Sequence, residues 1–487
     1  MAKSLRIGFL QASNEIDVQW FKPLSFGYLK AYLDKYLEGA FDMHFIDAQE
    51  DLRSFDIIAV SSTSQDFYIA KEIAASVKKI DKDIITILGG HHITYLPQTL
   101  TADFDIGVLG EGEETFREIM RYFIDNGLAL NGKTLNNIKG IVYWENGHHV
   151  ETPRRDLISP LDAIPFPYRL KGSEPYLFSS RGCPYKCAFC SSSAFWQNTR
   201  YFSAEYVVKE IEYIMENFSA IGYITIWDDL FIANKARFKQ FIELVEKKGL
   251  NDKLGFAFSV RANLVDDELC KDLKRINVKA TSFGAESGSD RILKLLKKGT
   301  TVEINQRAID ILYKHDISVI CSFIAGTPSE TENEVRSTYE FILKNITDGK
   351  LSPQCAVNIL MPMPGTDIWR YAVDANIIHI ANFDWKRLSV FASYRHSLTK
   401  NYDDWVEHRR NNNSIYLAEE TLPQERLYEI MRVYEKVITA LENNKILEKK
   451  NTELAIREKE LSAVLEREAS TRYMMRIISF LKRILHV

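Results

Sequence analysis

The stretch GCPYKCAFC occupies residues 182–190 and holds three of the six cysteines in a chain of 487 residues. Cys183, Cys187 and Cys190 are separated by three and then by two residues. Random placement of the cysteines would give roughly 0.001 triplets of this spacing, so chance does not explain the pattern. In a chain otherwise poor in cysteine, close thiols are more typical of a metal site than of a disulfide framework.

The number of thiols favours an iron-sulfur cluster over zinc. A structural zinc ion normally has four protein ligands, and no fourth cysteine or histidine lies close by in the sequence. Three thiolates suit a [4Fe-4S] cluster in which one iron keeps an open position for an outside ligand. The alternative is a zinc site completed by a distant histidine such as His91 or His315. The remaining cysteines, Cys270, Cys321 and Cys355, are expected to be small core residues.

The cysteines directly follow a predicted strand at residues 176–180. Further strand-like runs, with amphipathic helices between them, lie at residues 221–227, 254–260, 278–284, 317–326 and 355–362. About six strand-helix units predict a partial (β/α)6 barrel rather than a full barrel of eight units. Because active sites of barrels lie at the C-terminal ends of the strands, the cysteines are expected at that face.

The first part of the chain predicts an α/β domain with a doubly wound parallel sheet. Buried strands are expected at residues 5–10, 41–47, 55–62, 83–90 and 104–110, and helices at 23–37 and 65–80. Ligands of such sheets bind at the carboxyl ends of the strands. The candidate binding loops are therefore Ser61-Ser62, Gly89-Gly90 and Gly110-Glu111-Gly112, unless these residues only form tight turns.

Shifts in composition divide the chain into four parts. We expect a first domain at 1–125, a linker with room for one hairpin at 126–172, the barrel at 173–390 and a helical C-terminal region at 391–487. Residues 471–487 place apolar residues on one helical face and arginines opposite. Such a basic amphipathic helix lies on a membrane surface, docks onto a partner or covers the protein's own core.

Composition and charge narrow the function classes. The chain is 46% hydrophobic and 26% charged, with a formal net charge of −4, which gives no sign of a nucleic-acid binder. No apolar run approaches the roughly 18 residues of a membrane-spanning helix, and the N-terminus lacks the apolar region of a signal peptide. We expect a cytoplasmic protein, with peripheral membrane contact through the C-terminal helix as the further hypothesis.

The cysteine motif resembles the CxxxCxxC signature of the radical S-adenosylmethionine (radical SAM) enzymes, with the aromatic Phe189 before the last cysteine. The resemblance implies that the open iron binds the amino and carboxylate groups of SAM, and that an electron from the cluster cleaves SAM to a 5′-deoxyadenosyl radical. Further segments are similar to those of the family. They are WDDLF with Asp228, SVRAN with Arg261, FGAESGS with Glu286 and Ser287, FIAGTPSET with Ile324 and Gly326, and PMPGT at 362–366.

The resemblance also assigns roles to these segments. Asp228 would lie near the methionine end of SAM, and Arg261 would pair with its carboxylate, which suits a planar guanidinium. Glu286 would accept hydrogen bonds from the amino or ribose groups, and the backbone near Ile324 and Gly326 would pack on the adenine.

The first domain resembles the cobalamin-binding domain that precedes many radical SAM domains. The similar segments are PLSFGYLKAYL, AVSSTS, GGHHIT and DIGVLGEGEETF, which begin at residues 23, 59, 89 and 105. This implies that Ser61, Ser62, Gly89, Gly90, Gly110 and Glu111 bind cobalamin. The D-x-H-x-x-G motif that supplies a histidine to cobalt is incomplete, because the nearest match begins at Asp42 and ends in Asp47. His44 is therefore expected to be a strand residue.

The two resemblances together imply a cobalamin-dependent radical SAM methyltransferase. Its partners would be a small-molecule or lipid-linked substrate and an external electron donor such as flavodoxin or ferredoxin. A methylthiotransferase is not expected, because no cysteine precedes Cys183 to hold a second cluster. The alternatives are a radical cyclase, rearrangement or oxidation enzyme without methyl transfer, and a non-catalytic, cluster-containing scaffold.

Overall fold

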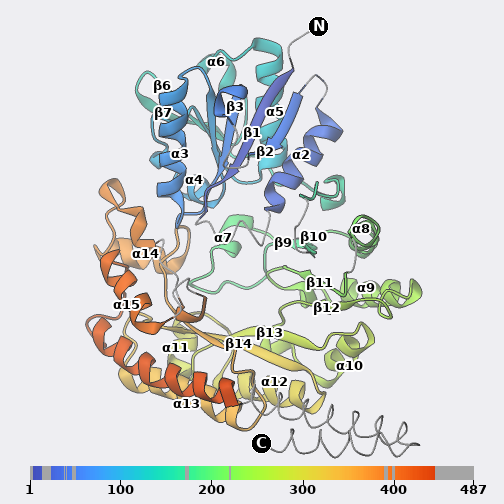
Figure 1. Ribbon diagram of the computed structural model, residues 1–487, viewed down its shortest axis with the longest axis vertical. Helices are drawn as coiled ribbons and strands as arrows, with labels where there is room; N and C mark the ends of the chain where they lie inside the picture. The colour runs from blue at the N-terminus through green and yellow to red at the C-terminus, as the bar shows by residue number, and fades with distance from the viewer. Residues whose placement is uncertain are drawn as a thin grey trace, which may run out of the picture.

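The computed structural model describes residues 4–13, 23–37, 39, 41–46, 51–170, 175–218, 221–388, 393–396 and 401–444. The first domain lies above the barrel in Figure 1, and the described C-terminal helices, in orange and red, run along the lower left of the molecule in front of the barrel. The loop that carries the three cysteines and the short helix α7 (Ser192–Trp196) lie between the two domains.

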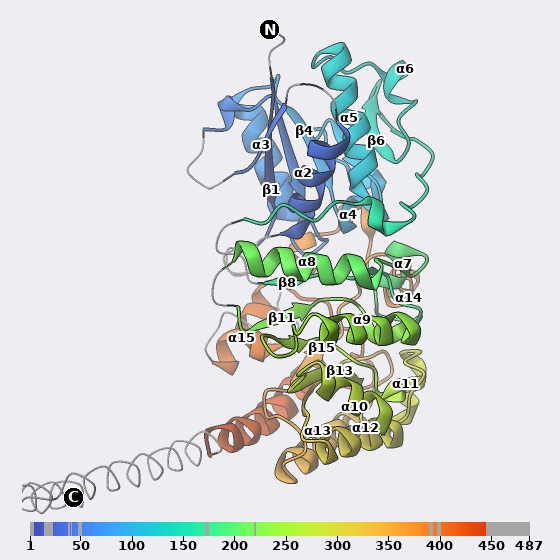
Figure 2. The ribbon, with the colours of Figure 1, turned by 90° about the vertical axis from the view of Figure 1, so that its right-hand side faces the viewer.

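The first domain is built on a seven-stranded sheet of order β2-β1-β3-β4-β5-β6-β7. The predicted parallel strands are confirmed: β1 (Leu5–Gln11), β2 (Phe41–Phe45), β3 (Ile57–Ser61), β4 (Ile85–Gly89) and β5 (Ile106–Val108). The helices are α2 (Leu24–Tyr36), α3 (Phe67–Ile80), α4 (His91–Tyr95), α5 (Gly112–Asn126) and α6 (Gly132–Leu135). The carboxyl ends of the parallel strands face the barrel (Figure 2).

The stretch expected to be a linker contains a hairpin that completes the first sheet. Strands β6 (Ile141–Glu145) and β7 (His148–Glu151) pair antiparallel, and β6 pairs with β5. Asn146 and Gly147 turn the chain with positive φ angles of 51° and 80°, as a tight hairpin requires. The hairpin covers the open edge of β5, so the sheet continues beyond the expected domain boundary at residue 125.

The second domain is a partial barrel, as predicted. Its parallel strands form two sheets of three, of orders β12-β11-β8 and β13-β14-β15, which a bridge between Ser259 and Ser282 joins. The strands are β8 (Tyr176–Leu177), β11 (Tyr223–Ile226), β12 (Gly255–Ala257), β13 (Ala280–Glu286), β14 (Ser318–Ala325) and β15 (Ala356–Ile359). The helices are α8 (Ala204–Asn217), α9 (Lys235–Lys247), α10 (Asp267–Arg275), α11 (Asp290–Leu295), α12 (Val302–Lys314), α13 (Glu332–Thr347) and α14 (Asp367–Asp374).

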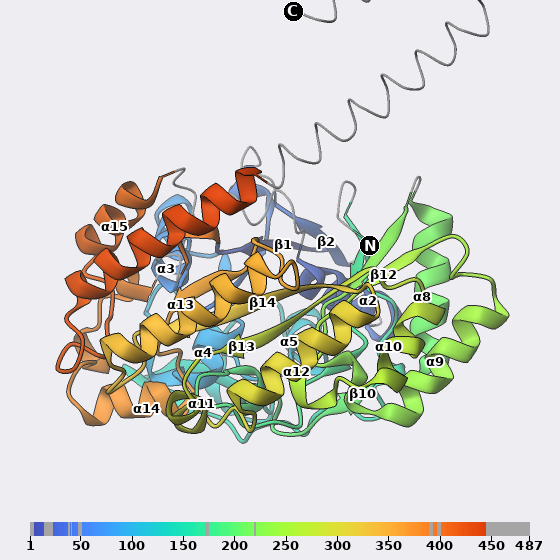
Figure 3. The same ribbon diagram turned by 90° about the horizontal axis from the view of Figure 1, so that it is seen from below.

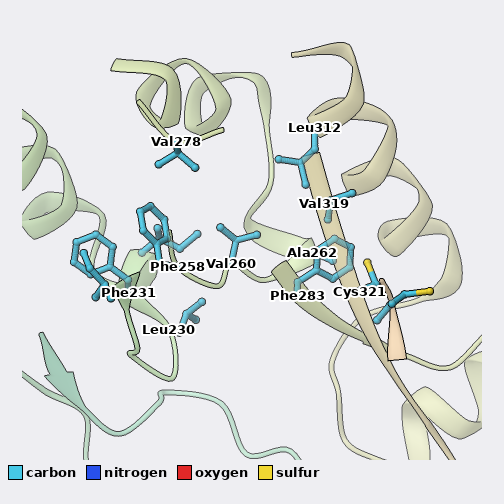
Figure 4. Packing of buried hydrophobic residues seen from close by; sticks show 14 of the residues in the cluster. Leu230, Phe231, Phe258, Val260, Ala262, Val278, Phe283, Leu312, Val319 and Cys321 are labelled. Atoms are coloured by element: carbon cyan, nitrogen blue, oxygen red, sulfur yellow. The ribbon is translucent and has the colours of Figure 1, made fainter. Parts of the chain in front are cut away.

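Alternate residues of the barrel strands pack against these helices. Phe283 and Val319 are buried in this layer, and Figure 4 shows them with Leu312 and Cys321. The period of two along each strand sends every second side chain to this core. Cys270, Cys321 and Cys355 are buried, which confirms the prediction that they are core residues.

Part of the C-terminal region covers the barrel. The described pieces are α15 (Tyr402–Asn411) and a helix over residues 424–444, which runs beside α13 in Figure 3. The ring of Tyr434 stacks on Tyr339 of α13, with centroids 4.6 Å apart. The predicted amphipathic helix at 471–487 lies outside the described residues. Among the described residues, no helix is long and apolar enough to cross a membrane.

Candidate functional site

A short antiparallel pair fixes both ends of the cysteine loop. Strand β9 (Ser180–Arg181) directly precedes the loop and pairs with β10 (Arg200–Tyr201), which directly follows it. Gly182 has a φ angle of +91°, and a Cβ there would lie 2.9 Å from the Cβ of Trp196 and 3.0 Å from the oxygen of Asn198. Only glycine suits this position, so the residue before Cys183 is set by the turn.

Within this loop, the three cysteines are half-buried and held by neighbouring backbone. The Ala188 amide donates to the Leu296 oxygen at 2.9 Å, and the Ile368 amide donates to the Ala188 oxygen at 3.2 Å. Burial raises the pKa of the Cys183 and Cys190 thiols, and the nearby carboxylate of Asp229 raises both further. Thiols in this environment bind as thiolates when a cationic cluster replaces their protons.

The two histidines of the zinc alternative have other contacts. His315 pairs with Asp267, its Nε2 atom 2.7 Å from the carboxylate. His91 instead packs its ring 4.3 Å from that of Phe195. Across the described ranges, no three His, Cys, Asp or Glu side chains form a group that could hold a single metal ion.

Arg261 reaches the cysteine loop from the end of β12. Its Nη1 atom donates to the Cys187 sulfur at 3.7 Å, and its guanidinium lies 3.7 Å from the centroid of the Tyr185 ring. The Nε and Nη2 atoms are buried and have no hydrogen-bond partner among the described residues. Buried donors without acceptors are costly, so the site offers two N–H groups to an incoming carboxylate. This fits the role that the sequence predicts for Arg261.

Glu286 is turned into the same region by an unusual backbone conformation. Its φ angle is +62°, and the pairing of β13 with β14 shifts register between Gly284 and Glu286. Glu286 accepts from the Lys298 Nζ atom at 2.6 Å, and that ammonium lies 5.9 Å from the centroid of Phe189. A positive φ in a non-glycine residue costs about 1 kcal/mol or more and is concentrated at functional sites.

The remaining residues predicted to contact SAM have different neighbours. Ile324 packs in one cluster with Ala188, and Phe189 packs against that cluster. Gly326 lies against the ring of Tyr416. Ser287 faces α13 instead, where its hydroxyl meets that of Thr338 at 3.3 Å. Phe189 lies in the cysteine loop itself. The structure brings Arg261, Glu286 and Ile324 toward this loop and turns Ser287 away from it.

Of the two adjacent aspartates in WDDLF, the one that was not predicted faces the cysteines. Asp228 is buried and accepts hydrogen bonds from the amides and hydroxyls of Ser179 and Ser180. Burial raises its pKa, which these hydrogen bonds oppose. Asp229 instead lines the cavity between the domains and accepts from the Ser192 hydroxyl. Asp228 therefore supports the loop, while Asp229 supplies charge beside the thiols.

A cavity of about 540 Å³ lies between the two domains, within the size range of small-molecule sites. The first domain contributes Ser61, Gly89, Gly90, Gly110 and Glu111, all predicted from the sequence, and the barrel contributes Ser191, Phe195 and Trp227 among others. A Cβ at Gly89 or Gly110 would meet no atom within 4 Å. These glycines therefore leave open space at the strand ends, as a flat cofactor such as cobalamin requires.

Two of the residues predicted to bind cobalamin have other contacts. Ser62 lies beneath Gly90, whose φ angle is +100° and whose Cβ would lie 2.5 Å from the Ser62 oxygen. Burial alone would raise the pKa of Glu111, but the guanidiniums of Arg181 and Arg200 outweigh it and hold that pKa below its ordinary value. Glu111 thus joins the domains.

His44 lies on β2 and pairs with Asp42 at 2.7 Å, which confirms that it is a strand residue.

Sequence reasoning missed several charged residues of this region. Arg181 binds both Glu111 and Glu113, and Lys298 binds Glu286. The only sequence signal for Arg181 was its position two residues before Cys183. The pairing of Lys298 had no sequence signal, because it depends on how the loop after α11 returns to β13.

Family models match both halves of the chain. The model of the radical SAM superfamily matches residues 177–342, and that of the B12 binding domain matches residues 23–120. An uncharacterized methyltransferase of Pyrococcus horikoshii is 32% identical over 387 residues, which are 75% of this chain and 81% of the relative.

Two further comparisons are with a sequence relative and with a solved structure. The anaerobic magnesium-protoporphyrin IX monomethyl ester cyclase of Cereibacter sphaeroides is 28% identical over 353 residues, 67% of this chain and 56% of the cyclase. The structure is similar to that of the radical SAM methyltransferase TsrM from Kitasatospora setae, solved with cobalamin and a [4Fe-4S] cluster. That likeness has a TM-score of 0.64 at 16% identity and covers 77% of this chain and 78% of TsrM.

Proposed function

The chain belongs to the radical SAM enzymes that carry a B12-binding domain before the barrel, and from this membership we propose that it is a cobalamin-dependent methyltransferase. One observation carries the proposal. A single cavity is bounded on one side by Gly89 and Gly110 at the strand ends of the first domain. On the other side it is bounded by Ser191, the residue after Cys190, and by Asp229. Two cofactors held there would face each other, as a radical methyl transfer needs.

When bound, the cluster and SAM supply a 5′-deoxyadenosyl radical, and cobalamin supplies the methyl group. The chain's own residues bind and orient these groups. Cys183, Cys187 and Cys190 would hold the cluster, and Arg261 would hold the SAM carboxylate through the N–H groups that have no partner among the described residues. Glu286 would accept from the amino or ribose groups. Because Lys298 already donates to one of its oxygens, its position for the cofactor is fixed in advance.

The proposal is tested by the products of SAM. Protein reconstituted anaerobically with iron, sulfide and hydroxocobalamin is given reductant, SAM and candidate substrates. We expect both 5′-deoxyadenosine and S-adenosylhomocysteine, and we expect the latter only in samples that hold cobalamin. Formation of 5′-deoxyadenosine without S-adenosylhomocysteine would contradict methyl transfer.

A second candidate is the cyclase, rearrangement or oxidation chemistry expected as the alternative from the sequence. The similarity to the magnesium-protoporphyrin cyclase supports it, although this chain spans little more than half of that enzyme. This candidate predicts 5′-deoxyadenosine without S-adenosylhomocysteine, so the product analysis above separates the two.

Enzymes of this family use small-molecule substrates and electron donors. An external donor such as flavodoxin or ferredoxin would reduce the cluster. The sequence pattern of residues 471–487 supports the finer hypothesis of a lipid-linked substrate at a membrane surface. Deletion of these residues should then abolish co-sedimentation with anionic liposomes, and unchanged co-sedimentation would contradict the hypothesis.

A further inference from the structure

A second cavity, of about 370 Å³, lies on the inner face of the barrel strands β11 to β14. Four of the residues that line it are small: Ala257 at the end of β12, Ser259 two residues later, and Ala280 and Ser282 on β13. The interior of a complete barrel is filled by layers of Val, Ile and Leu. Here Ala257, Ser259, Ala280 and Ser282 form part of the lining, beside the larger Ile226, Phe258 and Ile320. The small side chains in the lining leave open space inside the barrel.

The lining of this hollow includes a partly exposed tryptophan. Trp227 lies just after β11, and 43% of it is exposed. Its ring lies 5.1 Å from that of Tyr176 between centroids, with 38° between the planes. Tyr223 is 52% exposed and four residues earlier, so the strand period places it on the same face as Trp227. In Figures 1 and 2, β11 lies on the side of the barrel nearer the first domain.

Trp227 belongs to both cavities. It lines the hollow of the barrel and also the cavity between the domains. The indole therefore forms part of the boundary of both spaces. A large, partly exposed aromatic face at such a boundary is suited to stacking on a flat ligand.

The described lining of the hollow offers no available charge. Its polar groups include the hydroxyls of Thr225, Ser259 and Ser282, and the last two meet at 2.9 Å between Oγ atoms. Its one carboxylate, that of Asp228, accepts hydrogen bonds from Ser179 and Ser180. A phosphate, carboxylate or ammonium group placed here would lose its hydration without a counterion.

We propose that the barrel hollow receives an uncharged, flat ring of the substrate, which stacks on the indole of Trp227. The inference rests on the proposed function, since it takes the molecule bound here to be the substrate of the radical reaction. It makes Trp227 a specificity-determining residue and Ser282 a residue that keeps the space open. A substrate with charged groups would keep them outside the hollow.

Three probes that share one ring test the charge requirement. Indole is neutral, indole-3-acetate is an anion and tryptamine is a cation. Their binding to the reconstituted holoenzyme with SAM is measured by titration with ligand-observed saturation-transfer NMR. We expect indole to bind at least tenfold more tightly than either charged probe. Equal affinities for the three, or no measurable binding of indole, would overturn the proposal.

Three variants and two controls test the location. Trp227→Ala should weaken indole binding at least fivefold, Trp227→Phe should stay within threefold of wild type, and Ser282→Leu should block the hollow and weaken binding at least tenfold. The matched controls are Tyr313→Ala, which removes an exposed ring on α12, and Ser337→Leu, at an exposed site on α13. Indole binding to Trp227→Ala and Ser282→Leu that equals binding to the controls would overturn the proposal.

The same samples separate this inference from the proposed function. Iron, cobalt and 5′-deoxyadenosine are measured beside probe binding. If the probe pattern holds while S-adenosylhomocysteine is absent, the methyltransferase proposal fails and the ring-binding hollow stands. If 5′-deoxyadenosine and S-adenosylhomocysteine both form while the Trp227 and Ser282 variants bind the probe as wild type does, the ring-binding proposal is contradicted and the methyltransferase proposal is retained.

Discussion

Arg181 of the barrel donates from Nη1 to the Oε1 atom of Glu111 in the first domain, over 2.5 Å, and both side chains are buried. The second arm of the same guanidinium donates to Glu113, and Arg200 also donates to Glu111 at 2.8 Å. Because Arg181 lies two residues before Cys183, this ion-pair network connects the cysteine loop directly to the domain that would hold cobalamin. The two halves of the site are held in place by the same few charges.

Replacement of Arg181 should uncouple the two domains. Arg181→Ala leaves the buried carboxylate of Glu113 without this partner and Glu111 with Arg200 alone, and the loss of a buried ion-pair partner typically costs about 3–5 kcal/mol. We expect a clear fall in the thermal midpoint and faster proteolysis between residues 151 and 175. The control, Arg410→Ala, breaks a pair with Glu425 in which both side chains are exposed and should cost about 1 kcal/mol or less. Equal effects of the two variants would contradict a coupling role for Arg181.

Arg261 should control SAM affinity without controlling the cluster. Arg261→Lys keeps the charge but loses the planar fork of N–H donors, so we expect SAM to bind at least tenfold more weakly while the iron content stays near that of wild type. Equilibrium dialysis with labelled SAM measures the first quantity and a colorimetric iron assay the second. The exposed Arg291 provides the control substitution. Unchanged SAM affinity in Arg261→Lys would show that the guanidinium binds something else.

Gly89 should control the cobalt content. A Cβ at this position meets no atom within 4 Å, so Gly89→Leu can fold and extend its side chain into the interdomain cavity. We expect bound cobalt to fall at least tenfold after reconstitution and desalting, with iron unchanged. Gly222→Leu, at an exposed position before β11 where a Cβ would likewise meet no atom within 4 Å, is the control for added bulk. A Gly89→Leu protein with full cobalt content would mean that cobalamin binds elsewhere.

His92 should make the first domain sensitive to acid. Burial lowers the pKa of His92 to about 3, and its ring nitrogens lie 3.0 Å from the Ser64 hydroxyl and 2.8 Å from that of Thr99. Below the ordinary pKa of about 6.5 the unfolded chain takes up a proton that the folded chain refuses. Stability should therefore be constant above that pH and fall by up to about 1.4 kcal/mol per unit below it.

The acid sensitivity is measured as the difference in thermal midpoint between pH 7.5 and pH 5.5. We expect His92→Gln to show a smaller difference than wild type, while the exposed His148→Gln shows the same difference. If His92→Gln and wild type lose equal stability on acidification, His92 does not hold its neutral form in the folded protein.

The sequence predicted the strands well because the first domain buries them as short continuous apolar runs, while the barrel strand β13 alternates buried and more exposed residues. The run at residues 317–326 alternates buried and more exposed residues over the first part of β14 and is buried at its end, and the three close cysteines have a spacing that chance does not produce. These signals are local in the chain. They identified the candidate cofactors before any contact was known.

Contacts between distant segments could not be predicted in this way. Asp228 and Asp229 are neighbours of the same type, and only the position of Ser179 decides which of them is turned inward. Glu111 was expected to bind cobalamin because it follows a strand end, but its carboxylate forms ion pairs with Arg181 and Arg200. The β6–β7 hairpin looked like part of a linker, since its pairing with β5 joins residues about 35 apart.

The most direct test of the account is a count of iron and cobalt in protein reconstituted anaerobically with iron, sulfide and hydroxocobalamin and then desalted. The account predicts about four iron and one cobalt per chain. Cys187→Ala should lose the iron and Cys270→Ala should keep both metals, because Cys270 is a core residue. Four iron without cobalt would leave a radical SAM enzyme but contradict a cobalamin-dependent methyltransferase, and no bound iron in wild type would contradict the account as a whole.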